Sequence, residues 1–152
     1  MESNDYYMKQ ALDLAFRAFE EDEVPIGAVI IDRNGMIIGG GYNQVEGQCT
    51  QLAHAELQAI KDATKRLGTW RLEGCTMVVT LEPCSMCIGA IRLSRMAKVI
   101  YGASSPVFGF QLDNDQFIPL YNNGSFLIES GVLKEECSKI LKDFFQKKRN
   151  VL

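Results

Sequence analysis

The only histidine of this chain and a pair of cysteines thirty positions later constrain its structure more than any other feature. The histidine stands in the spacing His54-x-Glu56, and the cysteines stand in Pro83-Cys84-x-x-Cys87. One imidazole and two thiolates form a three-ligand zinc set, which leaves the fourth tetrahedral position open for water, as in catalytic sites. Any fold of this chain must therefore bring His54 close to a cysteine pair that is distant in sequence.

A glutamate two residues after the histidine adds a proton-transfer group to this set. Glu56 is placed to face a zinc-activated water without being a ligand, and to move the proton of that water to a substrate. The combination H-x-E and P-C-x-x-C is a signature of zinc nucleobase deaminases. A structural zinc usually has four protein ligands, and only Cys49 offers itself as a fourth, if its loop folds back. The pattern therefore favours a catalytic zinc over a structural one.

Length and composition indicate one globular domain over residues 1–152. Hydrophobic residues make up 47% and charged residues 23%, which is typical of soluble proteins. No apolar run approaches the roughly 18 residues of a membrane-spanning helix. The acidic, polar N-terminus does not resemble a signal peptide, so we expect a cytoplasmic protein. In that compartment a C-x-x-C pair indicates a metal or redox site instead of a structural disulfide, and the accompanying His-x-Glu favours the metal.

Charge is distributed unevenly along the chain. The net charge is −3, yet residues 1–23 carry seven acids against two bases, and residues 139–149 carry five bases against Asp143. A basic end on an acidic protein is consistent with an RNA-binding surface. It is equally consistent with a solvated helix end whose cations complement the helix dipole, so the composition leaves both interpretations open.

The hydrophobic pattern predicts alternating helices and strands around one sheet. Helices are expected over 4–21, 50–67, 83–93 and 133–149, and strands over 24–31, 36–40, 77–81, 99–101 and 126–128. Asn34-Gly35 should join the first two strands as an antiparallel hairpin, the three glycines at 39–41 should break the second strand, and Thr50 should cap the second helix, with Leu52 on its apolar side. Strands joined by helices should be parallel. This order predicts a three-layer α/β/α sandwich with a five-stranded mixed sheet.

With these motifs in view, the chain resembles the bacterial tRNA adenosine deaminases of the cytidine deaminase-like superfamily. The similarity covers nearly the whole chain and includes residues 23–29, 41–43, 53–56, 79–87 and 101–103. The metal motif alone gives the superfamily, whereas Leu81-Glu82-Pro83-Cys84 and a Phe-Phe pair before basic residues favour the tRNA branch. The resemblance implies a cytidine deaminase-like fold and a zinc-dependent homodimer. It also implies that the substrate is the wobble adenosine of a tRNA anticodon loop, which is converted to inosine.

The resemblance also implies three groups of substrate-binding residues. These are Asn43 for the base, Val24, Pro25 and Ile26 for the wall of the base pocket, and Phe144, Phe145, Lys148 and Arg149 for the RNA loop. RNA loops are read by stacking bases on aromatic rings while cations take the phosphates. From the residues alone, Asn43 is also suited to capping a turn, and either phenylalanine is also suited to the core.

Two segments depart from the family, and two rival functions stay open. Thr50-Gln51-Leu52 stands where the family usually has Asp-Pro-Thr, and residues 104–112 replace a polar loop that approaches the RNA in the family. One rival is a free nucleobase deaminase that acts on guanine or cytosine with the same zinc and Glu56. The other is a non-catalytic, zinc-stabilised RNA-binding subunit, although such subunits typically lose the glutamate.

Overall fold

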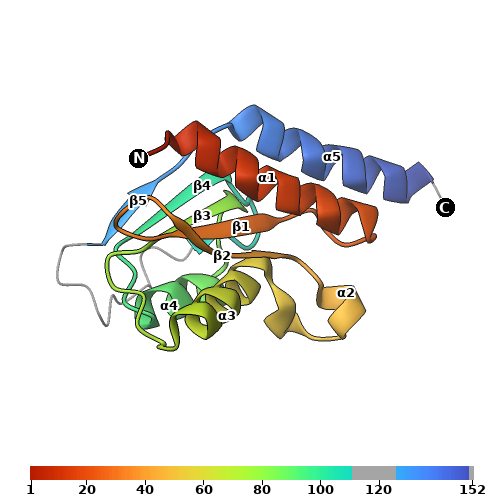
Figure 1. Ribbon diagram of the computed structural model, residues 1–152. Helices are drawn as coiled ribbons and strands as arrows, with labels where there is room; N and C mark the ends of the chain where they lie inside the picture. Colours follow the sequence, from red (N-terminus) through yellow and green to blue (C-terminus); the bar gives the residue numbers. More distant parts are fainter. Residues whose placement is uncertain (111–125, 151–152) are drawn as a thin grey trace.

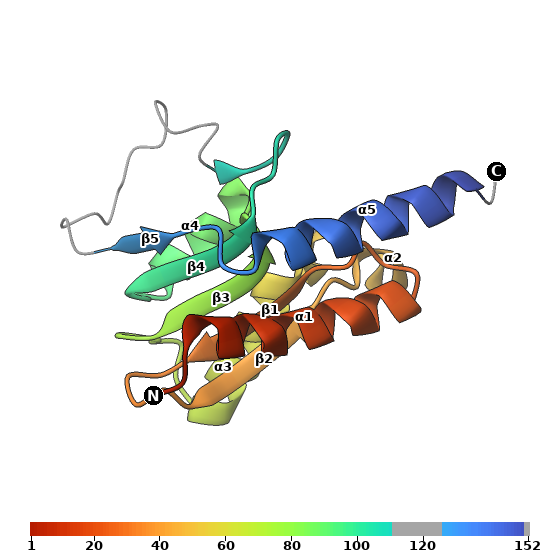
Figure 2. The ribbon, with the colours of Figure 1, turned by 90° about the horizontal axis from the view of Figure 1, so that it is seen from above.

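A five-stranded mixed sheet lies between two layers of helices in the computed structural model, which describes residues 1–110 and 126–150 (Figure 1). The helices of the two outer layers are α1 (Asn4–Glu20) and α5 (Lys134–Asn150) on one face, and α3 (Ala55–Leu67) and α4 (Ser85–Leu93) on the other. Figure 2 shows α1 and α5 side by side across the sheet. The predicted three-layer sandwich is therefore confirmed.

The strands follow the order β2-β1-β3-β4-β5 across the sheet. Their bounds are β1 (Gly27–Ile31), β2 (Ile37–Tyr42), β3 (Thr76–Leu81), β4 (Lys98–Ala103) and β5 (Leu127–Glu129). Strand β1 is antiparallel to both β2 and β3, whereas β3, β4 and β5 are mutually parallel. Strands β2 and β3 run in the same direction, as predicted, but β3 pairs with β1 instead of β2. All five residues of β1 are buried, as expected for a strand covered on both faces.

The glycines of β2 allow α3 to pack closely against the sheet. A Cβ atom on Gly39 would lie 2.7 Å from the backbone nitrogen of Ala63, and one on Gly41 would lie 2.6 Å from the backbone oxygen of Ala55. Real Cβ atoms do not approach a backbone so closely. Strand β2 continues through Tyr42, so the prediction that these glycines break it is wrong. They serve the close approach of a helix instead.

The helix expected over residues 50–67 is interrupted at His54. The Thr50 hydroxyl accepts a 3.1 Å hydrogen bond from the backbone N–H of Leu52 and caps one 3₁₀ turn, η1 (Gln51–Ala53). His54 is extended, with φ −62° and ψ 148°, and α3 begins at the next residue. Leu52 is 67% exposed, contrary to its predicted place on an apolar face. The interruption makes His54 the N-cap residue of α3, so its side chain projects from the helix end.

A short helix that the sequence did not predict, α2 (Val45–Gln48), follows β2. The buried carboxylate of Glu23 accepts hydrogen bonds from the backbone N–H groups of Glu46 and Gly47, at 2.9 and 2.7 Å. A carboxylate at this position satisfies N–H groups that have no partner within the helix. Helix α2 is too short to produce a hydrophobic period. Within residues 1–110 and 126–150, no helix combines the length and apolar composition that crossing a bilayer requires.

Candidate active site

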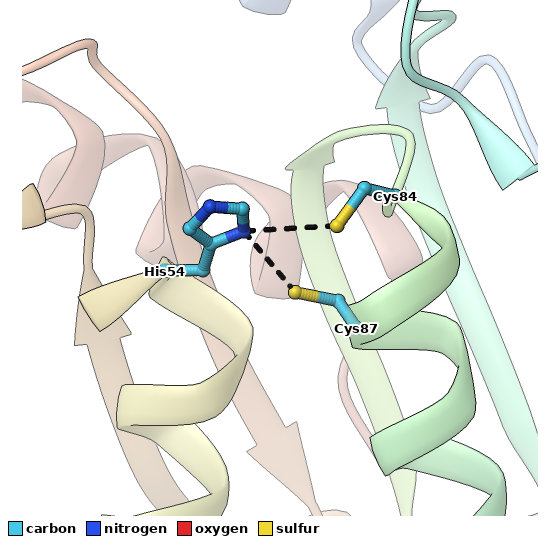
Figure 3. Close-up of side chains that lie close together, drawn as sticks. All are labelled: His54, Cys84 and Cys87. Carbon is cyan, nitrogen blue, oxygen red and sulfur yellow. Dashed lines mark hydrogen bonds between the residues drawn. The ribbon is translucent and has the colours of Figure 1, made fainter. Parts of the chain in front are cut away.

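The ends of two helices bring the predicted metal ligands together (Figure 3). His54 is the N-cap residue of α3, Cys84 is the N-cap residue of α4, and Cys87 lies in the first turn of α4. His54 Nδ1 lies 3.7 Å from Cys84 Sγ and 3.4 Å from Cys87 Sγ. The three ligand atoms all lie within 4.8 Å of one another. The structure thus assembles all three residues that the motif singled out.

These distances match what a zinc ion requires. Tetrahedral zinc binds sulfur at about 2.3 Å and nitrogen at about 2.0–2.1 Å, which separates a sulfur and a nitrogen ligand by about 3.6 Å. The two observed nitrogen–sulfur distances, 3.7 and 3.4 Å, lie on either side of that value. Within the described residues, these three side chains form a group capable of holding a metal ion. The donor set is therefore the right size and the right chemistry for zinc.

The electrostatics of the site favour a thiolate. A hydrogen bond from Cys87 lowers the pKa of the Cys84 thiol to about 4, and His54 adds to this effect. The same shared proton raises the pKa of Cys87 above its usual range, because the thiolate of Cys84 holds it in place. The hydrogen bond to Cys84 likewise raises the pKa of the His54 imidazole. Both cysteines also lie at the start of α4, where the helix dipole stabilises negative charge.

Glu56 is a buried carboxyl group beside the ligands. It lies in the first turn of α3, is 5% exposed, and lines the main cavity of the described residues together with His54. Burial raises the pKa of Glu56 to about 7, while a hydrogen bond from its own backbone N–H acts in the opposite direction. A carboxyl group whose charged form is disfavoured in this way is suited to taking and returning protons near neutral pH.

A glutamine that the sequence analysis did not single out as a site residue orients the histidine. Gln51 Oε1 lies 3.1 Å from His54 Nε2, on the opposite edge of the ring from the two sulfurs. An N–H at Nε2 that donates to this amide oxygen leaves Nδ1 with its lone pair toward the cysteines. The only sequence signal for this role was that residues 50–52 depart from the family pattern.

The cavity next to His54 has a volume of about 890 Å³, and it opens between the segment that follows α1 and the helices α2, α3 and α5. Asn43, Val24 and Ile26, for which the resemblance implied base binding, all line this cavity. The side-chain amide of Asn43 donates to the Val24 carbonyl at 3.1 Å, and its oxygen accepts a 3.3 Å hydrogen bond from the backbone N–H of Val45. Asn43 therefore shapes the cavity wall and retains a second N–H. Pro25 is buried and does not line the cavity. The backbone N–H of Ile26 donates to the Val24 carbonyl at 2.9 Å, so the chain turns tightly at Pro25 and leaves Val24 and Ile26 at the cavity.

The end of α5 contributes both packing and charge to this cavity. Phe144 is 4% exposed and packs edge-on against Phe19 and Phe145, with ring centroids 5.7 and 5.3 Å away. Phe144, Phe145 and Lys148 line the cavity, whereas Arg149 is exposed and does not. Phe144 thus joins the packing between helices and also forms part of the cavity wall.

A salt bridge that the sequence did not predict joins the ends of α1 and α5. Lys148 Nζ lies 2.6 Å from a carboxylate oxygen of Asp22, and both residues line the cavity. The Lys148 ammonium also lies 5.6 Å from the centre of the Phe144 ring. The lysine that was predicted to meet RNA phosphates is therefore paired with an acid of the same chain.

The divergent segment after β4 is attached next to the cysteine ligands. Glu82 Oε1 accepts a 3.1 Å hydrogen bond from the backbone N–H of Ser105, and the backbone N–H of Phe110 donates to the Pro83 carbonyl at 2.9 Å. A Cβ atom on Gly109 would lie 2.4 Å from the Glu82 carboxylate, so a larger residue there would displace that side chain. Residues 111–112 of the 104–112 departure lie outside the described residues.

Comparison with known proteins identifies relatives that span the chain. The cytidine and deoxycytidylate deaminase zinc-binding region matches residues 1–103. A tRNA-specific adenosine deaminase of Bacillus subtilis (strain 168) is 45% identical over 155 residues, covering 98% of this chain and 92% of the relative. A tRNA-specific adenosine deaminase of Haemophilus influenzae is 42% identical over 149 residues, covering 97% and 86%.

Solved structures agree with these relatives. One from a study of A-to-I editing by tRNA:A34 deaminases at the wobble position superposes with a TM-score of 0.80 at 35% identity, covering 90% of this chain and 99% of that chain. A guanine deaminase from Nitrosomonas europaea superposes with a TM-score of 0.78 at 24% identity, covering 95% and 85%. A sequence identity of 24% shows only that this chain and the guanine deaminase share a fold.

Proposed function

The chain belongs to the zinc-binding cytidine and deoxycytidylate deaminases, and within them to the tRNA-specific adenosine deaminases. We propose that it hydrolytically deaminates the wobble adenosine (A34) of a tRNA anticodon loop to inosine. The observation that carries this proposal is the buried Glu56 carboxyl beside His54, Cys84 and Cys87, in the wall of a cavity of about 890 Å³. That volume is within the range of about 300–1,000 Å³ typical of small-molecule sites.

We propose that His54, Cys84 and Cys87 hold the zinc ion. When bound, zinc would act as a Lewis acid that lowers the pKa of a water molecule, so that the water becomes a nucleophile near neutral pH. The two sulfurs provide negative charge that offsets the charge of the metal, and the nitrogen–sulfur distances of 3.7 and 3.4 Å support this assignment. Gln51 keeps the imidazole in the orientation that presents Nδ1 to the sulfurs.

Glu56 moves the protons of the reaction. The water oxygen forms a bond to C6 of adenine, the C6–N6 bond breaks, and ammonia leaves. Glu56 takes one proton from the attacking water and delivers it to N1 of the ring. It then takes the second proton from the oxygen now bonded to C6 and gives it to the departing amine, so that a C6 carbonyl forms as ammonia leaves. Its burial supports this role, because it raises the pKa of Glu56 to about 7. Near neutral pH the carboxyl group is therefore able both to accept and to release a proton.

The remaining lining residues would position the base and the RNA. Val24 and Ile26 supply apolar wall, and the second N–H of Asn43 is available to the edge of the purine. Phe145, which is 45% exposed, offers a ring surface for a neighbouring base. Lys148 offers a cation for a phosphate only when it is released from Asp22. We further propose that the protein is a cytoplasmic homodimer, as the resemblance implies.

The test is to incubate the zinc-loaded protein with an anticodon stem-loop that carries adenosine at position 34, and separately with guanine and with cytosine. We expect inosine in the stem-loop and no ammonia from either free base. Glu56→Gln is the matched control, because it keeps the size of the side chain and removes the proton acceptor. Turnover of a free base without turnover of the stem-loop would establish the free nucleobase deaminase instead.

A further inference from the structure

A second groove lies beside β2, which is an edge strand of the sheet. It has a volume of about 350 Å³. Its walls come from α1 and α3, which cover opposite faces of the sheet and both reach this edge. The floor includes Gly40 and Gly41, so no side chain of β2 fills the groove at those positions.

Three cations line this groove, and two of them lie on one helix face. Arg17 comes from α1, and Lys61 and Lys65 come from α3 at the i, i+4 spacing that places side chains side by side. Two like charges at this spacing repel each other, although Lys65 also lies in the last turn of α3, where a cation complements the helix dipole. Within residues 1–110 and 126–150, neither lysine takes part in a salt bridge.

Among the described residues that line the groove, Asp62 is the only acid, and it is already engaged. Asp62 Oδ2 accepts a 2.9 Å hydrogen bond from the backbone N–H of Gly40, which has no strand partner on that side. Gln58 and Gln44 also line the groove, and they bind each other at 2.7 Å. The groove therefore presents three positive charges against one carboxylate that serves the strand edge.

The neighbouring cavity has the opposite character. Among the described residues that line it, Lys148 is the only lysine or arginine. Besides Glu56, four acids line it, namely Glu21, Asp22, Glu23 and Glu46. Phosphate groups are repelled from such a rim, whereas an uncharged base is not. A nucleotide whose base enters the cavity is therefore favoured to keep its phosphates outside.

The cavity and the groove share a wall. Tyr42 lines the groove and the next residue, Asn43, lines the cavity. The Tyr42 hydroxyl donates a 2.6 Å hydrogen bond to Glu21, an acid of the cavity, and the Arg17 guanidinium lies 5.0 Å from the centre of the Tyr42 ring on the groove side. One short stretch of chain thus separates a base-sized cavity from a row of cations.

We propose that the groove lined by Arg17, Lys61 and Lys65 binds phosphodiester groups of the substrate RNA that flank the reacting nucleotide. This inference rests on the proposed function, because it requires an RNA substrate whose base enters the neighbouring cavity. Phosphate recognition by three clustered cations needs no sequence-specific contact, so the groove positions the RNA and leaves base selection to the cavity.

The first experiment measures stem-loop binding by the zinc-loaded protein across a salt series. The variant Lys61→Gln/Lys65→Gln is compared with wild type and with Lys9→Gln/Lys134→Gln, which removes the same charge from exposed positions on α1 and α5. Each lost phosphate contact on a single strand lowers the salt slope by about 0.7, so the groove variant should lose about 1.4. The affinity ratio between wild type and the groove variant should then narrow about sevenfold between roughly 50 and 200 mM salt. The control variant should keep the wild-type slope.

The second experiment maps the lysines by acetylation and mass spectrometry. Lys61 and Lys65 should react in the free protein and become protected by the stem-loop, while Lys9 and Lys134 stay reactive. Inorganic phosphate at the same phosphate concentration should protect neither pair. The proposal would be overturned if Lys61 and Lys65 were already protected from acetylation without RNA and if Lys61→Gln/Lys65→Gln changed the molecular mass of the protein in light scattering. That result would identify an interface between copies of the chain.

The outcomes separate this inference from the proposed function. A wild-type protein that deaminates the stem-loop, with a groove variant of unchanged affinity and salt slope, removes the groove from RNA binding and leaves the activity in place. Protection by inorganic phosphate alone, with an unchanged RNA slope, identifies a free-anion site and also overturns the proposal. A wild-type protein that neither binds nor deaminates the stem-loop refutes the proposed function itself.

Discussion

Replacing Gly41 with alanine tests whether the packing of α3 on β2 sets the position of the metal ligands. The added methyl group would lie 2.6 Å from the backbone oxygen of Ala55, which directly follows His54. Ordinary contact begins at 3.4 Å, so the start of α3 must move away from the sheet by about 0.8 Å. Metal sites tolerate ligand displacements of only about 0.2 Å, so the shift should disturb His54 directly.

The expected magnitudes follow from the same contact. Overpacking of this kind costs about 1–3 kcal/mol. For a chain of this length, a loss of about 2 kcal/mol corresponds to a fall in Tm of roughly 4–8 °C. Misplacing a ligand by altering its support typically weakens metal binding by about 10–100-fold, and we expect zinc affinity to fall within that range.

Two neighbouring glycines provide matched controls. A Cβ atom on Gly40 would lie 3.1 Å from a methyl group of Leu14, the free end of a side chain that is able to rotate. Gly40→Ala should therefore change stability by no more than about 0.5 kcal/mol and leave zinc affinity unchanged. Gly39→Ala meets α3 at Ala63, two turns beyond His54, so it should lower Tm with a smaller loss of zinc affinity.

The assays are thermal unfolding, zinc affinity by chelator competition, and deamination of the stem-loop. The three variants should rank differently in Tm and in zinc affinity. Gly41→Ala meets α3 beside His54, Gly39→Ala meets α3 further along the helix, and Gly40→Ala meets a flexible side chain. Equal Tm and equal zinc affinity in Gly41→Ala and Gly40→Ala would show that close packing of α3 does not hold the histidine in place.

Four further predictions concern single side chains. Glu56→Gln should keep zinc and fold but lower turnover by at least about 10²–10⁴-fold, measured at saturating stem-loop; activity within tenfold of wild type would mean that another group carries the protons. Cys87→Ala should lose zinc and activity together, and full zinc by elemental analysis would contradict the ligand assignment. Gln51→Ala should weaken zinc binding by about 10-fold while leaving Tm of the metal-free protein unchanged, and Gln51→Glu should restore the affinity; equal affinities would end the positioning role. Asp22→Asn should free Lys148, raise stem-loop affinity and steepen the salt slope by up to about 0.7, whereas weaker binding would show that the salt bridge itself organises the RNA site.

The clustering of His54, Cys84 and Cys87 was predictable from sequence because the chemistry that these residues share is local and specific. Few residue types bind zinc, and the spacing of Cys84 and Cys87 at the start of a helix places both sulfurs on one face. The layers of the fold were predictable for a similar reason, since strands and helices alternate with clear hydrophobic periods. Element boundaries also agreed within a few residues, as for α1, which was expected over 4–21 and spans Asn4–Glu20.

The features that the sequence did not reveal depend on contacts between distant segments. The pairing of β3 with β1 follows from which strand is buried on both faces, and no local pattern encodes that choice. Gly39 and Gly41 have the composition of a strand break, yet they permit a helix to approach, which is visible only once α3 is in place. The role of Gln51 likewise depends on the interruption at His54, which turns an expected helix into a 3₁₀ turn followed by an N-cap.

Charge shows most clearly why composition and arrangement give different answers. A net charge of −3 gives no sign of a polyanionic substrate, and the obvious basic segment at the C-terminus contains a lysine that is paired with Asp22. The fold gathers acids from α2 and from the segment that follows α1 around the cavity, while Lys61, Lys65 and Arg17 line one groove at the sheet edge. Attraction between charges in water weakens beyond about 8–10 Å, so an RNA chain responds to these local groups and not to their sum. An acidic protein is therefore able to accept a base in one place and hold phosphates in the next.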